Sequence, residues 1–158
     1  MNDVLTDVLQ SIWQSVLAKE VSFVEPASPD ETFPDGLTAS IQISGAWSGA
    51  IVASFPPALA RSLAAKMLEV DPDAASSEDL SDTLGEIVNM IGGNMKAMLP
   101  SPSRLSLPWV TTGHDVHLSF PHCTTKAGAR FVCDGESIVV CVIQLAVDEV
   151  GGASVSAE

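Results

Sequence analysis

The chain has 158 residues, of which 46% are hydrophobic and 17% charged, and it carries a formal net charge of −13 at pH 7. This length and apolar content suit one globular domain with a buried core and exclude an intrinsically disordered chain. The negative charge argues against nucleic acids and anionic membrane surfaces as partners, because their phosphate groups would repel the chain.

Membrane and secretion signals are not evident in the sequence. No apolar run approaches the roughly 18 residues that a membrane span needs, and the first residues lack the basic region and cleavage pattern of a secretory signal. Cysteines are odd in number, and two of the three lie in apolar, strand-like runs. We therefore expect a cytoplasmic protein with reduced thiols and no membrane insertion.

The first third of the chain combines a helix with a hairpin. Residues 3–19 carry apolar side chains at i, i+3/i+4 spacing and predict an amphipathic helix. A short strand is compatible with residues 21–24, and the prolines and acids of residues 25–36 predict a loop. Alternating residues at 38–44 and 50–55 predict two strands joined by a turn.

Two helices follow in the middle of the chain. Pro56-Pro57 suits the first turn of a helix that runs to about Leu68. Ser76 or Ser77 can cap the next helix, which extends to about Leu99, where Pro100-Ser101-Pro102 ends it. Its predicted core face consists of Leu80, Leu84, Ile87, Ile91, Met95 and Met98.

The last third is rich in predicted strands. Val116, Leu118 and Phe120 alternate with polar residues, and residues 129–133 form a second run. Asp134-Gly135 is a favourable hairpin turn. Residues 137–147 are almost continuously apolar, which is typical of a central strand.

These elements predict a single α+β domain with two layers. An antiparallel sheet should carry the two long helices, 57–68 and 77–99, on one face. The expected parts are an N-terminal helix and acidic, proline-rich loop (1–37), the core of the domain (38–147) and a frayed tail (148–158).

The solvent side of the helix over 77–99 carries the candidate site. At about 100° per residue, Asp82, Glu86, Asn89 and Gly93 fall within about 60° of one another, opposite the core face. A glycine inside a helix costs roughly 0.5–1 kcal/mol, but Gly93 would leave a bare spot where a partner's backbone can approach. An exposed Glu and Asn are more often a solvated surface, and two glycines can equally serve close packing or a bend.

Several spaced motifs resemble a known family. They are Gly45-x3-Gly49 with Phe55-Pro56, Leu59-Ala60, Asp82-x3-Glu86-x2-Asn89 with Gly92-Gly93-Asn94, and Leu105-Ser106-Leu107-Pro108. Together they resemble the CheX branch of the CheC/CheX/FliY chemotaxis phosphatases over roughly residues 38–147. The Glu-x-x-Asn helix is the most specific of these elements.

The resemblance implies an enzyme that hydrolyses the aspartyl phosphate of a CheY-like response regulator. Glu86 would contact the regulator's lysine, and Asn89 would orient the attacking water. Asp82 and Gly93 would belong to the partner-binding surface. No cofactor of its own is implied, since the regulator supplies Mg2+, and CheX-like domains pair through their sheets, so we expect a homodimer.

Two other interpretations remain to be weighed. A non-catalytic interaction or scaffold domain of a chemotaxis or two-component pathway is the main alternative, although the presence of both Glu86 and Asn89 favours the enzyme. His114, His117, His122 and Cys123 are close enough in sequence to suggest zinc. Strand alternation would point His117 and His122 in different directions, so we predict no metal site.

Overall fold

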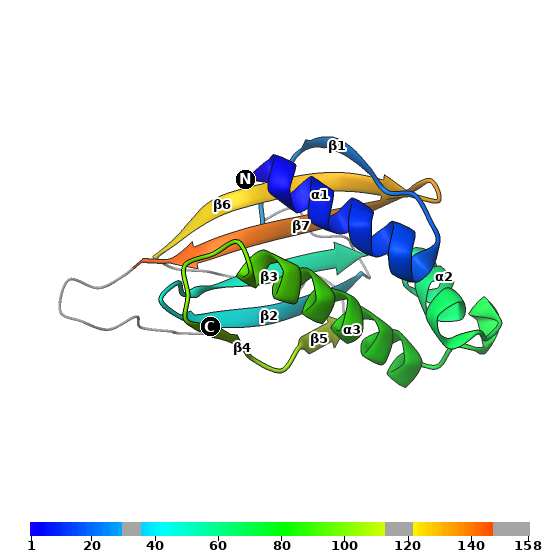
Figure 1. Ribbon diagram of the computed structural model, residues 1–158. Coiled ribbons are helices and arrows are strands. Elements are labelled where there is room, and N and C mark those ends of the chain that lie inside the picture. The colour runs from blue at the N-terminus through cyan, green and yellow to red at the C-terminus, as the bar shows by residue number, and fades with distance from the viewer. Residues whose placement is uncertain (30–35, 113–121, 147–158) are drawn as a thin grey trace.

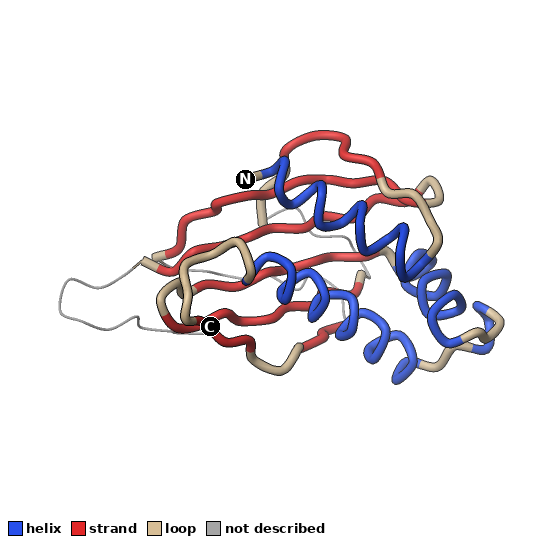
Figure 2. Tube along the Cα trace, viewed as in Figure 1, coloured by secondary structure: helices blue, strands red, loops and turns tan. Residues whose placement is uncertain are grey.

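The computed structural model describes residues 1–29, 36–112 and 122–146. Figure 1 shows the arrangement of the elements, and Figure 2 separates helices from strands by colour. In chain order the elements are α1 (Asn2–Ile12), η1, a π-helical turn (Trp13–Leu17), β1 (Ser22–Pro26), β2 (Leu37–Gly45), β3 (Gly49–Phe55), α2 (Pro57–Leu68), η2, a 3-10 turn (Pro72–Ala74), α3 (Ser77–Lys96), β4 (Ser103–Leu105), β5 (Trp109–Thr112), β6 (Cys123–Cys133) and β7 (Glu136–Leu145).

The described strands form one antiparallel sheet in the order β1-β6-β7-β3-β2-β4, with β5 also paired to β2. Helices α1 and α3 lie across one face of this sheet (Figure 1). The predicted fold class, an α+β domain with helices on one face of an antiparallel sheet, is therefore confirmed.

The helix layer differs from the prediction in which helices it contains. Helix α1 lies beside α3 on the sheet, whereas α2 packs against α3 and η1 beyond the end of the sheet (Figure 1). The cause is an apolar stripe that runs through α1 into η1 and buries Leu5, Leu9 and Trp13 completely in the main core. The side chain of Asn2 also holds the start of α1 to β6, because its Nδ2 donates to the Gly128 carbonyl (3.2 Å) and its Oδ1 accepts from the Gly128 amide (3.0 Å).

Strand β7 accounts for the longest apolar run in the sequence. It lies between β6 and β3, and alternate residues belong to two separate apolar clusters on its two faces. Ile138, Val140 and Val142 join the main core, while Val139 and Ile143 belong to the second cluster, together with Val52 of β3. A strand buried on both faces needs apolar side chains at every position, so the predicted central strand is confirmed.

The ends of α3 show one agreement and one correction. At its start, Ser76 and Asp79 form a capping box, in which Ser76 Oγ accepts from the Asp79 amide (3.1 Å) and Asp79 accepts from the Ser76 amide (2.9 Å). At its end, the helix stops at Lys96, and Met98 in the following turn is 60% exposed. The assignment of Met98 to the core face was wrong, because the helical period no longer applies there.

Other predictions near the C-terminus have mixed outcomes. Asp134 and Gly135 both adopt positive φ and form the β6–β7 turn, as predicted. The predicted strand around Val116, Leu118 and Phe120 and the tail at 148–158 lie outside the described residues. Within the described ranges, no helix is long and apolar enough to cross a membrane.

Candidate functional site

Helix α3 carries all four of the residues predicted for the site. Asp82, Glu86 and Gly93 are exposed to solvent, whereas Asn89 is half-buried. The opposite side of the helix packs on the sheet, with Leu84, Ile87, Val88, Ile91 and Met95 among its buried residues. This packing anchors the helix, which presents the carboxylate of Glu86 and the amide of Asn89 one turn apart.

Two glycines of α3 face neighbouring segments of the chain. A Cβ on Gly85 would lie 3.5 Å from Pro108, and a Cβ on Gly92 would lie 3.0 Å from Ile41 and 3.3 Å from Leu105. At about 100° per residue, Asn89 lies on the flank of the helix that these glycines share. Asn89 is half-buried on this flank, whereas Glu86 is exposed.

The β4–β5 connection is held in place by the edge of β2. Ser106 makes two hydrogen bonds to the backbone of Gln42, with its amide donating to the carbonyl (2.9 Å) and its Oγ accepting from the amide (2.9 Å). Next to it, Leu107 is 89% exposed. An apolar side chain is thus displayed to solvent on a fixed loop beside the candidate site.

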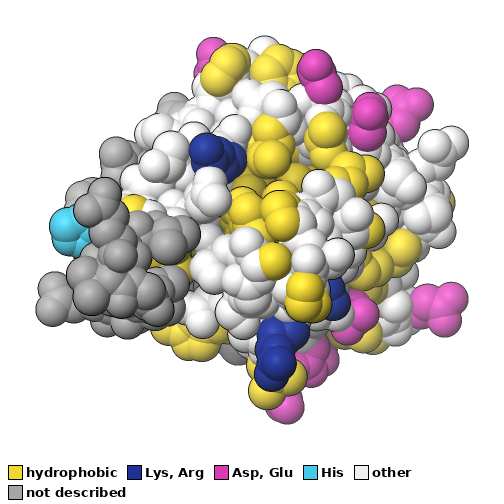
Figure 3. Space-filling model, turned by 60° about the vertical axis from the view of Figure 1, so that its left-hand side comes forward, with side chains coloured by type: hydrophobic (Ala, Val, Ile, Leu, Met, Phe, Trp, Pro, Cys, Tyr) yellow, Lys and Arg dark blue, Asp and Glu magenta, His cyan; other side chains and the backbone are white. Residues whose placement is uncertain are grey.

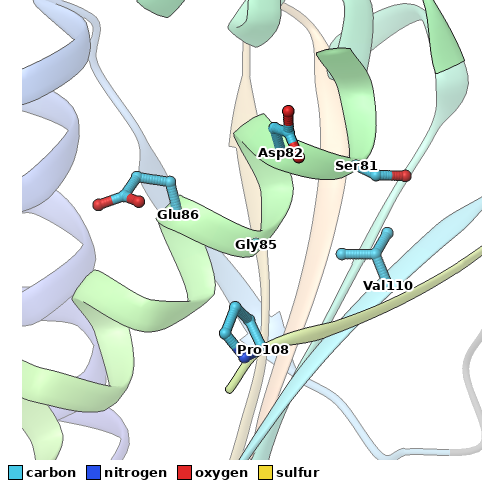
Figure 4. Close-up of a pocket in the computed structure, with 6 residues that line it drawn as sticks. All are labelled: Ser81, Asp82, Gly85, Glu86, Pro108 and Val110. Atoms are coloured by element: carbon cyan, nitrogen blue, oxygen red, sulfur yellow. The ribbon is translucent and has the colours of Figure 1, made fainter. Parts of the chain in front are cut away.

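A pocket of about 460 Å³ lies between α3 and this segment. Its lining residues are Ser81, Asp82, Gly85 and Glu86 from the helix and Pro108 and Val110 from the facing chain. Figure 4 shows that the carboxylate of Glu86 points away from Ser81 and Val110, so Asp82 and Glu86 form two separate negative positions. Pro108 lies beside Gly85, where a Cβ would make an ordinary van der Waals contact with it (3.5 Å).

Acidic residues far outnumber basic residues in this chain. The chain has 20 acidic and 7 basic residues, and Lys96, at the end of α3, is the only basic residue in that helix. Figure 3 shows one face of the molecule, with hydrophobic side chains gathered across the middle, acidic ones around the margin and some Lys and Arg side chains among them. Since α3 itself carries four acidic residues, Glu78, Asp79, Asp82 and Glu86, it is suited to a partner that brings positive charge.

Metal chemistry finds little support in the described part of the chain. No group of three or more His, Cys, Asp or Glu side chains is arranged there to hold a metal ion. Of the residues weighed for zinc, His114 and His117 lie outside the described residues, and His122 and Cys123 adjoin each other at the start of β6. Burial raises the pKa of the Cys123 thiol above its ordinary value.

The two side chains predicted to carry the chemistry are the carboxylate of Glu86 and the carboxamide of Asn89. A carboxylate can accept hydrogen bonds from an ammonium group, and a carboxamide can both donate to and accept from a water molecule. The four candidate residues include no hydroxyl or thiol nucleophile with an activating base beside it. The pair is suited to holding groups that another molecule brings.

The sequence of the domain identifies its family. Residues 37–134 match the family model described as chemotaxis phosphatase CheX. The chain belongs to the CheX family. The match spans β2, β3, α2, α3 and the strands up to the β6–β7 turn, and it includes all four candidate residues.

Solved structures share the fold over nearly the whole CheX domain. CheX in the CheX–CheY–BeF3–Mg2+ complex from Borrelia burgdorferi superposes with a TM-score of 0.76 at 20% identity, covering 90% of this chain and 96% of that one. CheX from Vibrio vulnificus gives 0.74 at 19% identity, covering 89% and 93%. FliY from Thermotoga maritima gives 0.61 at 15% identity, covering 90% and 89%. A comparison with curated protein sequences gave no match.

Four lining residues of the pocket were not predicted as site residues from the sequence. Ser81 and Gly85 lie on the helix beside Asp82 and Glu86, whereas Pro108, named only in the family resemblance, and Val110 follow more than twenty residues after them. No periodicity links segments so far apart. The pairing of β5 with β2, which places Val110 opposite Ala39, is what brings them to the helix.

Proposed function

We propose that this protein hydrolyses the aspartyl phosphate of a CheY-like response regulator. The observation that carries the proposal is the geometry of α3 in a member of the CheX family: exposed Glu86 and half-buried Asn89 lie one turn apart, with open space over Gly93. A related complex that contains CheX, CheY, BeF3 and Mg2+ adds support for a CheY-like partner.

In this mechanism Asn89 orients the attacking water. An aspartyl phosphate is already activated, so hydrolysis mainly lacks a water molecule held in line with phosphorus. The carboxamide of Asn89 accepts one hydrogen bond from the water and donates another, which fixes its direction. The water oxygen bonds to phosphorus as the bond from phosphorus to the aspartyl oxygen breaks, releasing inorganic phosphate and the free carboxylate.

Glu86 has the complementary role of contacting the regulator's lysine. Its exposed carboxylate can form a charge-assisted hydrogen bond with an ammonium group at the regulator's site. Asp82 and Gly93 belong to the same contact surface. The Mg2+ that neutralises the phosphoryl oxygens belongs to the regulator, so this protein supplies positioning groups only.

Phosphate release provides the test. A CheY-like receiver domain is phosphorylated, and inorganic phosphate is followed with and without this protein, in Mg2+ and after chelation. We expect release to accelerate in proportion to the protein added and to require Mg2+. Binding of the regulator with no acceleration would instead support the non-catalytic interaction domain.

A further inference from the structure

The chain that follows α3 contains an irregularity in its pairing with β2. Leu105 of β4 lies opposite Ile43, and Trp109 of β5 lies opposite Ser40. Between these two pairs β2 has two residues, whereas the facing chain has three, residues 106–108. One extra residue on one strand of an antiparallel pair is a β-bulge, which bends the strand and changes the side to which its side chains point.

The bulge changes which side chain faces α3. Leu105 lies on the helix side, since a Cβ on Gly92 would be 3.3 Å from it. Regular alternation would place Leu107 on the same side. Instead Leu107 is 89% exposed, and Pro108 lies beside Gly85, where a Cβ would be 3.5 Å from its ring (Figure 4). A short, rigid ring therefore takes the place that a leucine would have next to the helix.

The hydroxyl of Ser106 completes the hydrogen bonds at the bulge. It accepts from the Gln42 amide (2.9 Å) and donates to the Leu107 carbonyl (2.9 Å), so it lies between a donor of β2 and an acceptor of the bulged chain. The Ser106 amide also donates to the Gln42 carbonyl (2.9 Å). A bulge interrupts the backbone ladder, and here a side-chain hydroxyl takes the place of the missing backbone contact. Removing the hydroxyl would loosen the chain at the point where it turns toward α3.

The same segment packs on the part of α3 that carries Asn89. Gly85 precedes Asn89 by four residues and Gly92 follows it by three, so each glycine that the bulged chain approaches lies one helical turn from Asn89. Around the helix axis, Asn89 is about 40° from Gly85 and about 60° from Gly92. Its half-buried side chain therefore borders the surface on which the bulged chain packs.

We propose that the bulge at residues 106–108 positions the carboxamide of Asn89, and that Ser106 is a positioning residue for the hydrolysis. Leu105 and Pro108 form a ledge beside Asn89 that restricts its rotamers and keeps the amide in one direction. Ser106 acts by holding this ledge against β2 and touches neither the water nor the phosphoryl group. The inference rests on the proposed function, since a water-positioning amide is the group that needs a fixed direction. Preorganisation of this kind raises the rate at saturation and adds little to affinity.

The test compares the rate at saturation with the affinity. Phosphate release is measured with a saturating phosphorylated CheY-like receiver domain in Mg2+, and affinity is measured with the same domain activated by beryllofluoride. Ser106→Ala should lower the saturated rate roughly fivefold to twentyfold, less than loss of the Asn89 amide itself, because a misaligned group keeps part of its effect. Its affinity should equal that of the wild type. Ser106→Thr keeps the hydroxyl on an exposed side chain with room for a methyl group, so it should keep the wild-type rate.

A second measurement reports on Asn89 without any catalysis. The NMR signals of its side-chain amide are assigned by their disappearance in Asn89→Ala, and their order parameter measures how firmly the amide is held. The order parameter should fall in Ser106→Ala and stay at the wild-type value in Ser106→Thr.

Ser54→Ala is the matched control, because it removes a serine hydroxyl from the same sheet. Ser54 Oγ lies 3.2 Å from Thr38 Oγ1, within hydrogen-bond distance. Ser54 also lies opposite Val139 of the second apolar cluster, on the face of the sheet away from α3. Its loss should lower stability while leaving the rate and the order parameter of Asn89 unchanged.

The outcomes separate this inference from the proposed function. If the wild type does not accelerate phosphate release, the proposed function fails and the role of Ser106 in hydrolysis with it. If the wild type is active but Ser106→Ala keeps either its saturated rate or the order parameter of Asn89, only the positioning role is overturned. A loss of affinity at an unchanged rate would also overturn it, because Ser106 would then belong to the contact surface. An equal loss of rate in Ser54→Ala would overturn it as well, since general weakening of the sheet would be the cause.

Discussion

Gly92 and Gly93 are adjacent in sequence but have opposite surroundings. A Cβ on Gly92 would lie 3.0 Å from the buried Ile41, whereas a Cβ on Gly93 would meet nothing within 4 Å. Gly92 thus allows α3 to approach β2 and β4 closely, and Gly93 leaves the solvent side of the helix bare. The two positions should respond differently to the same substitution.

The first prediction is a difference in stability between two alanine variants. Gly93→Ala should raise the free energy of unfolding by about 0.5–1 kcal/mol, because alanine is the better helix former and has free space. Gly92→Ala should lower it, since the contact with Ile41 outweighs the gain in helix propensity. Urea denaturation measures both. An equal increase in the two variants would contradict the packing assigned to Gly92.

The second prediction concerns the bare surface at Gly93. Gly93→Leu should weaken binding of an activated regulator while leaving the fold stable, because leucine favours the helix but projects into the approach to Asn89. Gly93→Ala is the control for a small side chain. If Gly93→Leu leaves the affinity for the regulator unchanged, Gly93 is not part of the surface that contacts the regulator.

Glu86 is predicted to act on binding and rate together. Glu86→Ala removes the carboxylate that contacts the regulator's lysine, so both the affinity for the regulator and the rate of phosphate release should fall. Glu78→Ala, on the same helix and also exposed, controls for the loss of one negative charge. Wild-type affinity in Glu86→Ala would be incompatible with the lysine contact.

The fourth prediction is that the protein is a homodimer. The sheet ends at β1, an edge strand on which Phe23 and Val24 are 42% and 51% exposed. Open sheet edges with apolar side chains need protection from uncontrolled pairing. Light scattering at micromolar concentration should give twice the 16.5 kDa mass of the chain. A mass of one chain would count against pairing.

Much of the fold follows from periodicity in the sequence. The stripe of α1, the hairpin of β2 and β3, the capping of α3 and the continuous apolar run of β7 are local patterns with local causes. Strands β4 and β5 were not predicted, because they are short and each directly follows a proline, Pro102 and Pro108. The position of α2 beyond the sheet depends on how α1 and α3 pack on the sheet. No local sequence pattern predicts that packing.

The candidate site was likewise predicted only in part from the sequence. Helical spacing places Asp82, Glu86, Asn89 and Gly93 on one side of α3, and the structure agrees, except that Asn89 is half-buried. Helical spacing also could not show that Pro108 and Leu105 lie against Gly85 and Gly92. Such contacts between distant segments become visible only once the strand pairing is known.

The role of Asn89 separates chemistry from binding. Asn89→Ala should lower catalysed phosphate release by on the order of 10²-fold or more, the scale expected when one aimed transition-state group is lost. Stability should change by less than about 1 kcal/mol, because the side chain is only half-buried and alanine favours the helix. Binding of a regulator that carries a stable phosphate mimic should survive.

Asn89→Asp is the most direct test of the water-positioning amide. Aspartate has nearly the same shape, but it lacks the N–H donor and adds a negative charge that faces the phosphoryl group. Phosphate release from a phosphorylated CheY-like receiver domain should therefore fall as far in Asn89→Asp as in Asn89→Ala. Wild-type turnover in Asn89→Asp would contradict this role of the amide and favour a domain that binds the regulator without hydrolysing its phosphate.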